Sequence, residues 1–355
     1  MAHLGIESVL VAGRGPAACA VIAACGRLGV KAVAVHSEAE RSALHVRLAD
    51  DAVLLGPAPA TESYLAVDRI VEAARRSGVA AVLPVPPALA GNARLAAAVV
   101  EAGLRWVAPD AEVLERLGGD GVEPASERGL LGWVTAEGLR FPTPVARDRA
   151  AGIARVTWTP EDRPHDTAQI PATELPRAAR RLAEVGWRGL VTVGIAPDGE
   201  LAEVAAGFSL DMAVLERAHG VDAVELALLS AAPDTGSAPV GQPARAAVVV
   251  QLRAGLPPGT PGRVTGRLPG SGPMPAPDAG VELVAVSGYE PGDRLDGWYD
   301  ALLATVSAAG PDTATAARAA SEALSGLPDV GVPHNGADVR AVLGRLAAGS
   351  RIRSD

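Results

Sequence analysis

A glycine-containing turn near the N-terminus is the first feature of this chain with a possible chemical role. Gly13-Arg14-Gly15 follows the apolar run Val9–Ala12, and a glycine turn between a strand and a helix can bring backbone N–H groups close to a phosphate. The Gly-x-Gly pattern does not by itself distinguish a nucleotide site from a tight turn that serves only the fold. From these residues alone, both interpretations stay open.

The other reactive residue types show no spacing that defines a site. Cys19 and Cys25 lie six apart in a predicted helix, and because no zinc-ligand spacing surrounds them we expect buried structural thiols. Neither Gly-x-Ser-x-Gly, nor His-Glu-x-x-His, nor a biotin-accepting Met-Lys-Met motif occurs. Lys31 is the only lysine, so arginine would have to supply any other cation for a phosphate. The six histidines are scattered, at His3, His36, His45, His165, His219 and His334.

Composition and charge describe a globular protein with an aliphatic core. Of the 355 residues, 48% are hydrophobic and 21% charged, but only 3% are aromatic, and this balance is typical of folded domains. The net charge of −9 argues against a nucleic-acid surface, which needs clustered cations. No apolar run approaches the roughly 18 residues that span a bilayer, and the N-terminus lacks the basic start of a secretory signal. We therefore expect no membrane contact and a cytoplasmic location.

Short strands alternate with helices over the first third of the chain. Each predicted helix ends before a glycine, as helices with left-handed C-terminal caps do. The alternation predicts a parallel, doubly wound sheet. The predicted strands are Val9–Ala12, Ala32–Val35, Ala52–Leu54 and Ala80–Pro84, the predicted helices are Ala17–Leu28, Tyr64–Ser77 and Arg94–Ala102, and the closing glycines are Gly29, Gly78 and Gly103.

Later segments give local signals of the same kind. A helix is predicted from Thr173 to Gly186, and Pro197–Gly199 is typical of a hairpin turn. Gly255–Gly280 is dense in proline and glycine, which predicts irregular loop or short edge strands. Near the C-terminus, Asp312 is expected to cap an alanine-rich helix through Leu324, and Gly336–Ala347 to form the last helix.

Three segments of the N-terminal third resemble a known family. Ala34–Leu65, Ser8–Ala18 and Gly103–Gly121 are similar to the N-terminal domain of biotin carboxylase, the ATP-grasp enzyme that carboxylates biotin for acyl-CoA carboxylases. Ser8–Ala18 falls where that family has a strand and an Asn-Arg-Gly turn that serves the fold more than the nucleotide. The resemblance therefore favours a structural role for Gly13-Arg14-Gly15.

The resemblance continues as an outline of the fold. It implies an α/β fold in which residues 1–120 form a Rossmann-like pre-ATP-grasp domain with a parallel sheet. Residues 121–237 would be a truncated ATP-grasp α+β core without a lid, and residues 243–355 a C-terminal biotin-carboxylase-type α+β domain. The segments that follow the family's order of elements are Leu139–Trp158, Ala172–Val204, His219–Leu228 and Val286–Val306.

Set against the family, the residues that bind ATP are mostly replaced. The family inserts a lid with a glycine-rich phosphate loop between Gly121 and Leu139, where this chain has only Val122–Gly138. It also has a phosphate-binding lysine at the position of Gly121. The family's His-Pro-Gly-Tyr-Gly loop corresponds here to Leu83–Pro87, which is stiffer and apolar.

Three residues are left as candidates for chemistry under the resemblance. Glu203 matches one of a pair of magnesium-binding glutamates, but Gly194 stands at the other position, so a solvated strand-end glutamate is the preferred interpretation. Asp211 stands where a glutamate acts as the base on bicarbonate, without the family's arginine and histidine beside it. We favour Asp211 as the N-cap of the following helix. Arg140 is the candidate for binding a cofactor. The arginine that steadies the biotin enolate, expected near Val281–Val284, is absent.

Two functions from different classes follow. The first is a non-catalytic biotin carboxylase-like protein, a structural or regulatory subunit without cofactor. It would form a homodimer, or a heterodimer with a biotin carboxylase-type subunit, and could also contact carboxyltransferase or biotin carrier subunits. The alternative is an ATP-dependent ligase, of biotin carboxylase type or of altered ATP-grasp chemistry, that binds ATP and Mg²⁺ in the cleft between domains through Glu203, Asp211 and Arg140.

Overall fold

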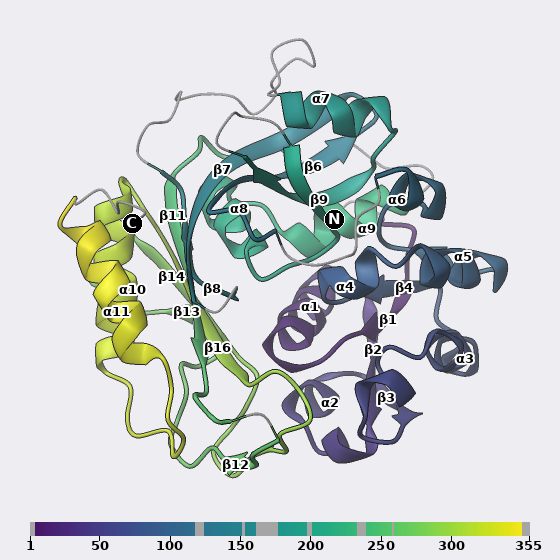
Figure 1. Cartoon of the computed structure of the whole chain (residues 1–355), viewed down its shortest axis with the longest axis horizontal. Coiled ribbons are helices and arrows are strands. Elements are labelled where there is room, and N and C mark those ends of the chain that lie inside the picture. Colours follow the sequence, from purple (N-terminus) through teal and green to yellow (C-terminus); the bar gives the residue numbers. More distant parts are fainter. Residues whose placement is uncertain are drawn as a thin grey trace.

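The chain is built on two large β-sheets with helices on their faces (Figure 1). The computed structural model describes residues 4–117, 124–150, 153–160, 177–196, 201–232, 239–257 and 259–349. The predicted hairpin turn at Pro197–Gly199, the helix start at Thr173 and the position of Gly121 lie outside these residues.

The N-terminal sheet has five parallel strands in the order β3-β2-β1-β4-β5. Its central strands are apolar on both faces, because helices cover both sides of a parallel sheet. The predicted parallel, doubly wound sheet is confirmed. The strands are β1 (Ser8–Ala12), β2 (Lys31–Ser37), β3 (Asp51–Gly56), β4 (Ala81–Pro84) and β5 (Arg105–Trp106).

Six helices belong to this N-terminal unit. The three predicted helices are present, and Gly29, Gly78 and Gly103 all have positive φ, between 63° and 77°, a conformation that glycine adopts without strain. The helices are α1 (Gly15–Leu28), α2 (Leu44–Leu48), α3 (Val67–Ser77), α4 (Pro87–Ala90), α5 (Ala93–Glu101) and α6 (Ala111–Leu117).

The second sheet has nine strands, and each pairs antiparallel with its neighbours. It runs without a break through both the middle and the C-terminal segments, because β8 pairs with β11. In sheet order the strands are β10 (Leu201–Ala206), β9 (Gly189–Ile195), β6 (Arg128–Thr135), β7 (Gly138–Ala150), β8 (Ile153–Trp158), β11 (Ala246–Arg253), β16 (Leu302–Gly310), β14 (Glu282–Ser287) and β13 (Gly272–Met274). The domain boundaries at 121–237 and 243–355 stay a prediction.

Helices cover the two faces of this sheet. Figure 1 shows α10 (Thr313–Ser325) and α11 (Gly336–Ala347) on the outer face, away from the N-terminal unit. On the other face lie α8 (Met212–His219) and α9 (Ala223–Ser230), and α1 packs there against β14 and β16. Asp312 caps α10 by accepting a hydrogen bond from the amide of Thr315, as predicted. The remaining elements are α7 (Arg177–Glu184), β12 (Gly262–Arg263) and β15 (Arg294–Leu295).

One sequence expectation needs refinement. Strand β6 pairs with β9 and β7 inside the large sheet, and it lies within the segment Val122–Gly138 that was expected only to bridge a gap. The segment His219–Leu228 contains the end of α8 and the start of α9, because Gly220 with φ 65° ends α8 and Asp222 caps α9 through two backbone amides. By contrast, the described residues of Gly255–Gly280 contain only the short strands β12 and β13, as expected.

Candidate functional site

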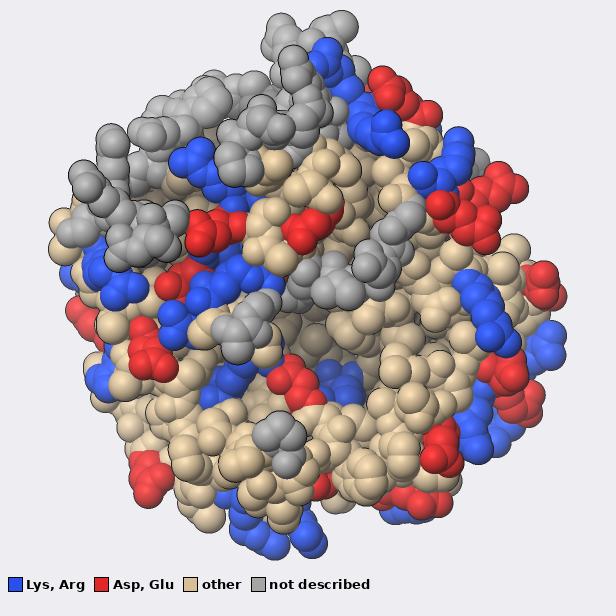
Figure 2. Space-filling view, in the orientation of Figure 1, with Lys and Arg blue, Asp and Glu red and all other residues tan. Residues whose placement is uncertain are grey.

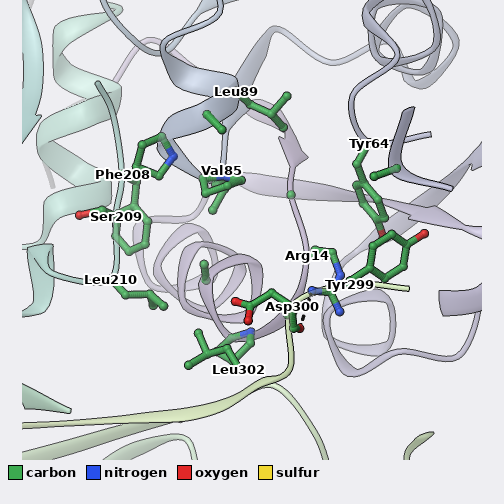
Figure 3. Close-up of a pocket in the computed structure, with 18 of the residues that line it drawn as sticks. Arg14, Tyr64, Val85, Leu89, Phe208, Ser209, Leu210, Tyr299, Asp300 and Leu302 are labelled. Atoms are coloured by element: carbon green, nitrogen blue, oxygen red, sulfur yellow. Dashed lines mark hydrogen bonds between the residues drawn. The ribbon is translucent and has the colours of Figure 1, made fainter. Parts of the chain in front are cut away.

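A cavity of about 410 Å³ lies where the N-terminal unit faces the large sheet. Its walls come from residues 13–17, 85–89, 208–210 and 298–300, together with several single side chains. Figure 2, which draws the molecule in the orientation of Figure 1, shows a hollow near the centre of the view with largely uncharged walls. In Figure 3, Val85 and Leu89 lie across the cavity from Asp300 and Leu302.

Arg14, from the glycine turn before α1, is one of two arginines that line the cavity. Its guanidinium forms an ion pair with Glu40 at 2.8 Å, and the Glu40 side chain is only 7% exposed. The hydroxyl of Tyr64 donates to the same carboxylate at 2.6 Å. Burial alone would raise the pKa of Glu40, but the neighbouring Arg14 charge outweighs it and lowers that pKa.

The same guanidinium reaches the C-terminal part of the chain. Its Nη1 donates to the backbone oxygen of Asp300 at 3.2 Å and its Nη2 to the hydroxyl of Tyr289 at 3.4 Å. It also lies 4.6 Å from the centre of the Tyr299 ring, within cation–π range. Every guanidinium nitrogen of Arg14 thus has a partner within the chain, which supports the structural interpretation of this turn.

Arg253, at the end of β11, is the other arginine in the cavity wall. Its Nη1 donates to both carboxylate oxygens of Asp300, and its Nη2 donates to Gln251 at 2.6 Å. The Arg253 side chain is 17% exposed and that of Asp300 is 57% exposed. This ion pair therefore lies at the solvent boundary, unlike the buried pair of Arg14 and Glu40.

The loop after β4 makes the cavity wall apolar and poor in donors. Proline has no backbone N–H, and Pro16, Pro86 and Pro87 all line the cavity. Val85 and Leu89 add aliphatic surface to the same wall. The apolar character expected of Leu83–Pro87 is confirmed, although Leu83 and Pro84 belong to β4 and Pro87 begins α4.

Asp211 does not have the role that the sequence favoured. It stands at the N-cap position of α8, but its side chain makes no capping hydrogen bond. Instead it accepts from Arg147 Nε at 2.8 Å and from the Thr157 hydroxyl at 2.9 Å. Arg147 and Asp211 are 4% and 3% exposed. Asp211 is therefore at the predicted N-cap position but does not have the predicted capping role. The family's motif arginine and histidine are replaced as the sequence indicated, and Arg147, from a distant part of the chain, pairs with Asp211 instead.

Glu203 lies opposite Gly194 in the pairing of β10 with β9. One of its carboxylate oxygens accepts from both the amide and the hydroxyl of Ser126, at 2.9 and 2.8 Å. Burial opposes ionisation, but these hydrogen bonds outweigh it and lower the pKa of Glu203. Glu203 is thus held by a neighbouring loop rather than being a freely solvated strand-end residue. Its role as a metal ligand stays a prediction.

Arg140 lies at the start of β7, outside the set of residues that line the cavity. Its guanidinium is 5.7 Å from the Trp133 ring centre and 5.2 Å from that of Phe141. Its Nη2 donates to the backbone oxygen of Pro239. The three candidates of the sequence therefore do not share one cavity wall, and the cofactor-binding role of Arg140 stays a prediction.

Sequence reasoning missed Arg147, Arg253 and Asp300. The sequence did contain a signal for Arg147, because Arg147 is spaced by even numbers of residues from the apolar Leu139 and Val145. In β7 these three positions face inward and are buried. Arg253 and Asp300 are 47 positions apart in the sequence, and no local pattern predicts such a contact.

The described residues contain no group of three or more His, Cys, Asp or Glu side chains placed to hold a metal ion. Magnesium prefers several oxygen ligands in octahedral geometry. The single carboxylate of Glu203, with one oxygen that already accepts hydrogen bonds from Ser126, is a poor fit to this preference. Among the helices of the described ranges, none has the length and apolar character to cross a bilayer.

Comparison with known proteins identifies the class of fold. The biotin carboxylase domain of Hydrogenobacter thermophilus 2-oxoglutarate carboxylase, solved as a dimer with MgADP, ADP and bicarbonate, matches with a TM-score of 0.76 and 17% identity. That match covers 97% of this chain and 96% of the solved one. At this identity the likeness establishes the fold, a biotin carboxylase-type ATP-grasp α/β architecture.

Sequence comparison then finds similarity to a known family in the N-terminal third. Residues 5–114 match the family model "Biotin carboxylase, N-terminal domain". The biotin carboxylase of Pseudomonas aeruginosa is 42% identical over 155 residues, which is 44% of this chain and 34% of that protein. The mitochondrial propionyl-CoA carboxylase alpha chain of Rattus norvegicus is 38% identical over 112 residues, which is 32% of this chain and 15% of that protein.

Residues 5–114 are therefore similar to the N-terminal domain of biotin carboxylase, and the chain as a whole has a biotin carboxylase-type fold. Its sequence match spans about a third of the Pseudomonas protein and less of the rat protein. The fold match extends over nearly the whole chain. The fold is thus shared further along the chain than the sequence similarity that accompanies it.

Proposed function

We propose that this chain is a non-catalytic, biotin carboxylase-like subunit that acts through its surface in an acyl-CoA carboxylase-type assembly. The observation that carries the proposal is the pairing of the two arginines in the cavity wall and of the buried Asp211. Arg14, Arg253 and Asp211 each have an oppositely charged partner from this same chain. Phosphoryl transfer requires cations that are free to neutralise the moving phosphate.

The buried pair of Arg147 and Asp211 gives the strongest support. A general base must release its partners and reach substrate, and freeing Asp211 would leave the Arg147 charge uncompensated at 4% exposure. Breaking a buried ion pair in this way costs about 3–5 kcal/mol. We infer that Asp211 holds the large sheet to α8 and is not the base of a carboxylation reaction.

No cofactor is part of this proposal. ATP and Mg²⁺ belong to the alternative of an ATP-dependent ligase, and the described residues do not fit a magnesium nucleotide well. One oxygen of the Glu203 carboxylate already accepts two hydrogen bonds from Ser126, and the wall of the cavity contains three prolines that cannot donate from their backbone.

A dimer with a biotin carboxylase-type subunit is the assembly we propose. The related domain of 2-oxoglutarate carboxylase is a dimer in its solved structure. A chain of the same fold can occupy one position in such a pair without performing the reaction. Contacts with carboxyltransferase or biotin carrier subunits are further proposals of the same kind.

The test of catalysis is bicarbonate-dependent release of ADP by the purified chain supplied with free biotin and Mg-ATP. The Pseudomonas aeruginosa biotin carboxylase, assayed in parallel, is the positive control. We expect no bicarbonate-dependent rate above a reaction without protein. A rate that depends on both bicarbonate and biotin would refute the non-catalytic proposal and establish the ligase.

The test of assembly is separate. The chain is co-expressed with the biotin carboxylase subunit of its own host, and the mass of the purified species is measured by light scattering. We expect a one-to-one heterodimer. Two species that elute independently at micromolar concentration would refute the pairing, whatever the catalytic assay gives.

A further inference from the structure

We propose that the cavity between the N-terminal unit and the large sheet binds a small, largely apolar monocarboxylate, whose carboxylate replaces that of Asp300 on Arg253. The proposal concerns the ligand of the cavity. It goes beyond the proposed function and does not depend on whether the chain assembles with a carboxylase.

The cavity has the size and lining of a small-molecule site. Its volume of about 410 Å³ lies within the range of about 300–1,000 Å³ usual for ligand pockets. Phe208, Leu89 and Leu302 contribute apolar surface to its walls, and Figure 3 shows their side chains around the central space. A ligand that buries most of its surface there must itself be mostly apolar.

The mouth of the cavity carries exposed hydrophobic side chains. Trp298 is 57% exposed and Leu65 is 50% exposed, and both line the cavity. Large apolar side chains left in water beside a concave site are typical of binding surfaces. We infer that a bound ligand shields both side chains.

Only one of the two arginines in the wall can exchange its partner easily. The Glu40 carboxylate on Arg14 is 7% exposed and also accepts from Tyr64, so it stays in place. The Asp300 carboxylate on Arg253 is 57% exposed, and an exposed ion pair gains little free energy over its solvated groups. The Nε of Arg253 is buried and has no hydrogen-bond partner within the described residues, so the guanidinium has a donor to spare.

The number of hydrogen-bond donors in the cavity wall also limits the negative charge that a ligand can carry. A carboxylate is satisfied by one guanidinium through two parallel hydrogen bonds. A phosphate dianion needs further donors, and the prolines at positions 16, 86 and 87 have no backbone N–H to donate. The site therefore suits a single negative charge on an apolar body.

The experiment uses sodium octanoate as the probe, with 1-octanol and octyl phosphate as chemical controls. Binding to the full chain is measured by titration calorimetry and by the change in tryptophan fluorescence, which the Trp298→Phe variant assigns to the cavity mouth. We expect octanoate to bind more tightly than either control, with the negative heat-capacity change of apolar burial.

Two variants with opposite expected effects test the role of Arg253. Arg253→Gln should weaken octanoate binding by about 10- to 100-fold, as expected for loss of hydrogen bonds to a charged group. Asp300→Asn removes the competing carboxylate and should tighten octanoate binding by about two- to fivefold. Arg245→Gln is the matched control, because Arg245 pairs with Glu282 and does not line the cavity.

The outcomes are distinguishable from a folding defect. Asp300 is an exposed residue, so Asp300→Asn should keep the melting temperature and still change the affinity. The proposal is overturned if octanol or octyl phosphate binds as tightly as octanoate, or if Asp300→Asn weakens octanoate binding. Absence of octanoate binding at millimolar concentration would overturn it as well.

Discussion

The Asp211→Asn variant tests whether Asp211 is structural. The substitution keeps the shape of the side chain but removes its charge, leaving the Arg147 guanidinium buried at 4% exposure without a counter-ion. Loss of one partner from a buried pair costs about 3–5 kcal/mol. This is a large part of the about 5–15 kcal/mol by which folded domains are stable.

The size of the effect can be expressed as a melting temperature. If the 355 residues unfold as one unit, the unfolding entropy at the midpoint is about 0.75 kcal/mol/K. Asp211→Asn should then lower the melting temperature by about 4–7 °C. Differential scanning calorimetry or far-UV circular dichroism measures this shift directly.

Two further variants complete the test. Glu290→Gln breaks an exposed pair with Arg47, in which Glu290 is 62% exposed, and should change stability by less than about 1 kcal/mol. The double variant Arg147→Met with Asp211→Leu removes both buried charges and should recover most of the lost stability. If Asp211→Asn costs no more than Glu290→Gln, the reasoning about a buried structural pair is wrong.

Three further predictions concern the core, a turn and a buried acid. Burial raises the pKa of the thiols of Cys19 and Cys25 to about 12. Ellman's reagent at pH 8 should therefore label neither cysteine in the folded chain and both in urea. Rapid labelling of the folded chain would contradict this prediction. A Cβ on Gly13 would lie 2.2 Å from a backbone oxygen, so Gly13→Ala should destabilise by about 3 kcal/mol or more. Gly26→Ala in the open part of α1 should stabilise by about 0.5–1 kcal/mol, and equal urea midpoints for the two variants would refute the packing argument. Burial raises the pKa of Glu216 from 4.5 to about 7, so the folded state binds the proton more tightly and its stability falls as pH rises from about 4.5 through 7. Glu216→Gln should flatten this slope in urea titrations at pH 5 and pH 8, and an unchanged slope would show that another group titrates.

Local patterns predicted much of the fold because their causes are local. Gly29, Gly78 and Gly103 end helices because a residue without Cβ adopts positive φ freely. Asp312 caps α10 through the amide three residues on, which the sequence displays directly. The alternation of strands and helices over the first third gave the parallel sheet for the same reason.

The site was less predictable because its contacts join distant parts of the chain. Asp211 looked like an N-cap, since a carboxylate before an apolar helix usually is one. In the folded chain, Arg147 lies 64 positions away in sequence and competes successfully for the same carboxylate. The candidates Glu203 and Arg140 were placed by resemblance, which gives a position in a sequence but not the partners that surround it.

The sequence by itself predicted the parallel sheet of the N-terminal unit and the resemblance of that unit to biotin carboxylase. Only the tertiary structure decided what became of the charges that remain. Ion pairing depends on which side chains are brought within about 4 Å of one another and on how much water stays between them. Both quantities arise when distant segments pack together, as β7 does with the residue before α8 and as the glycine turn before α1 does with the backbone of Asp300. No single segment of the chain determines them.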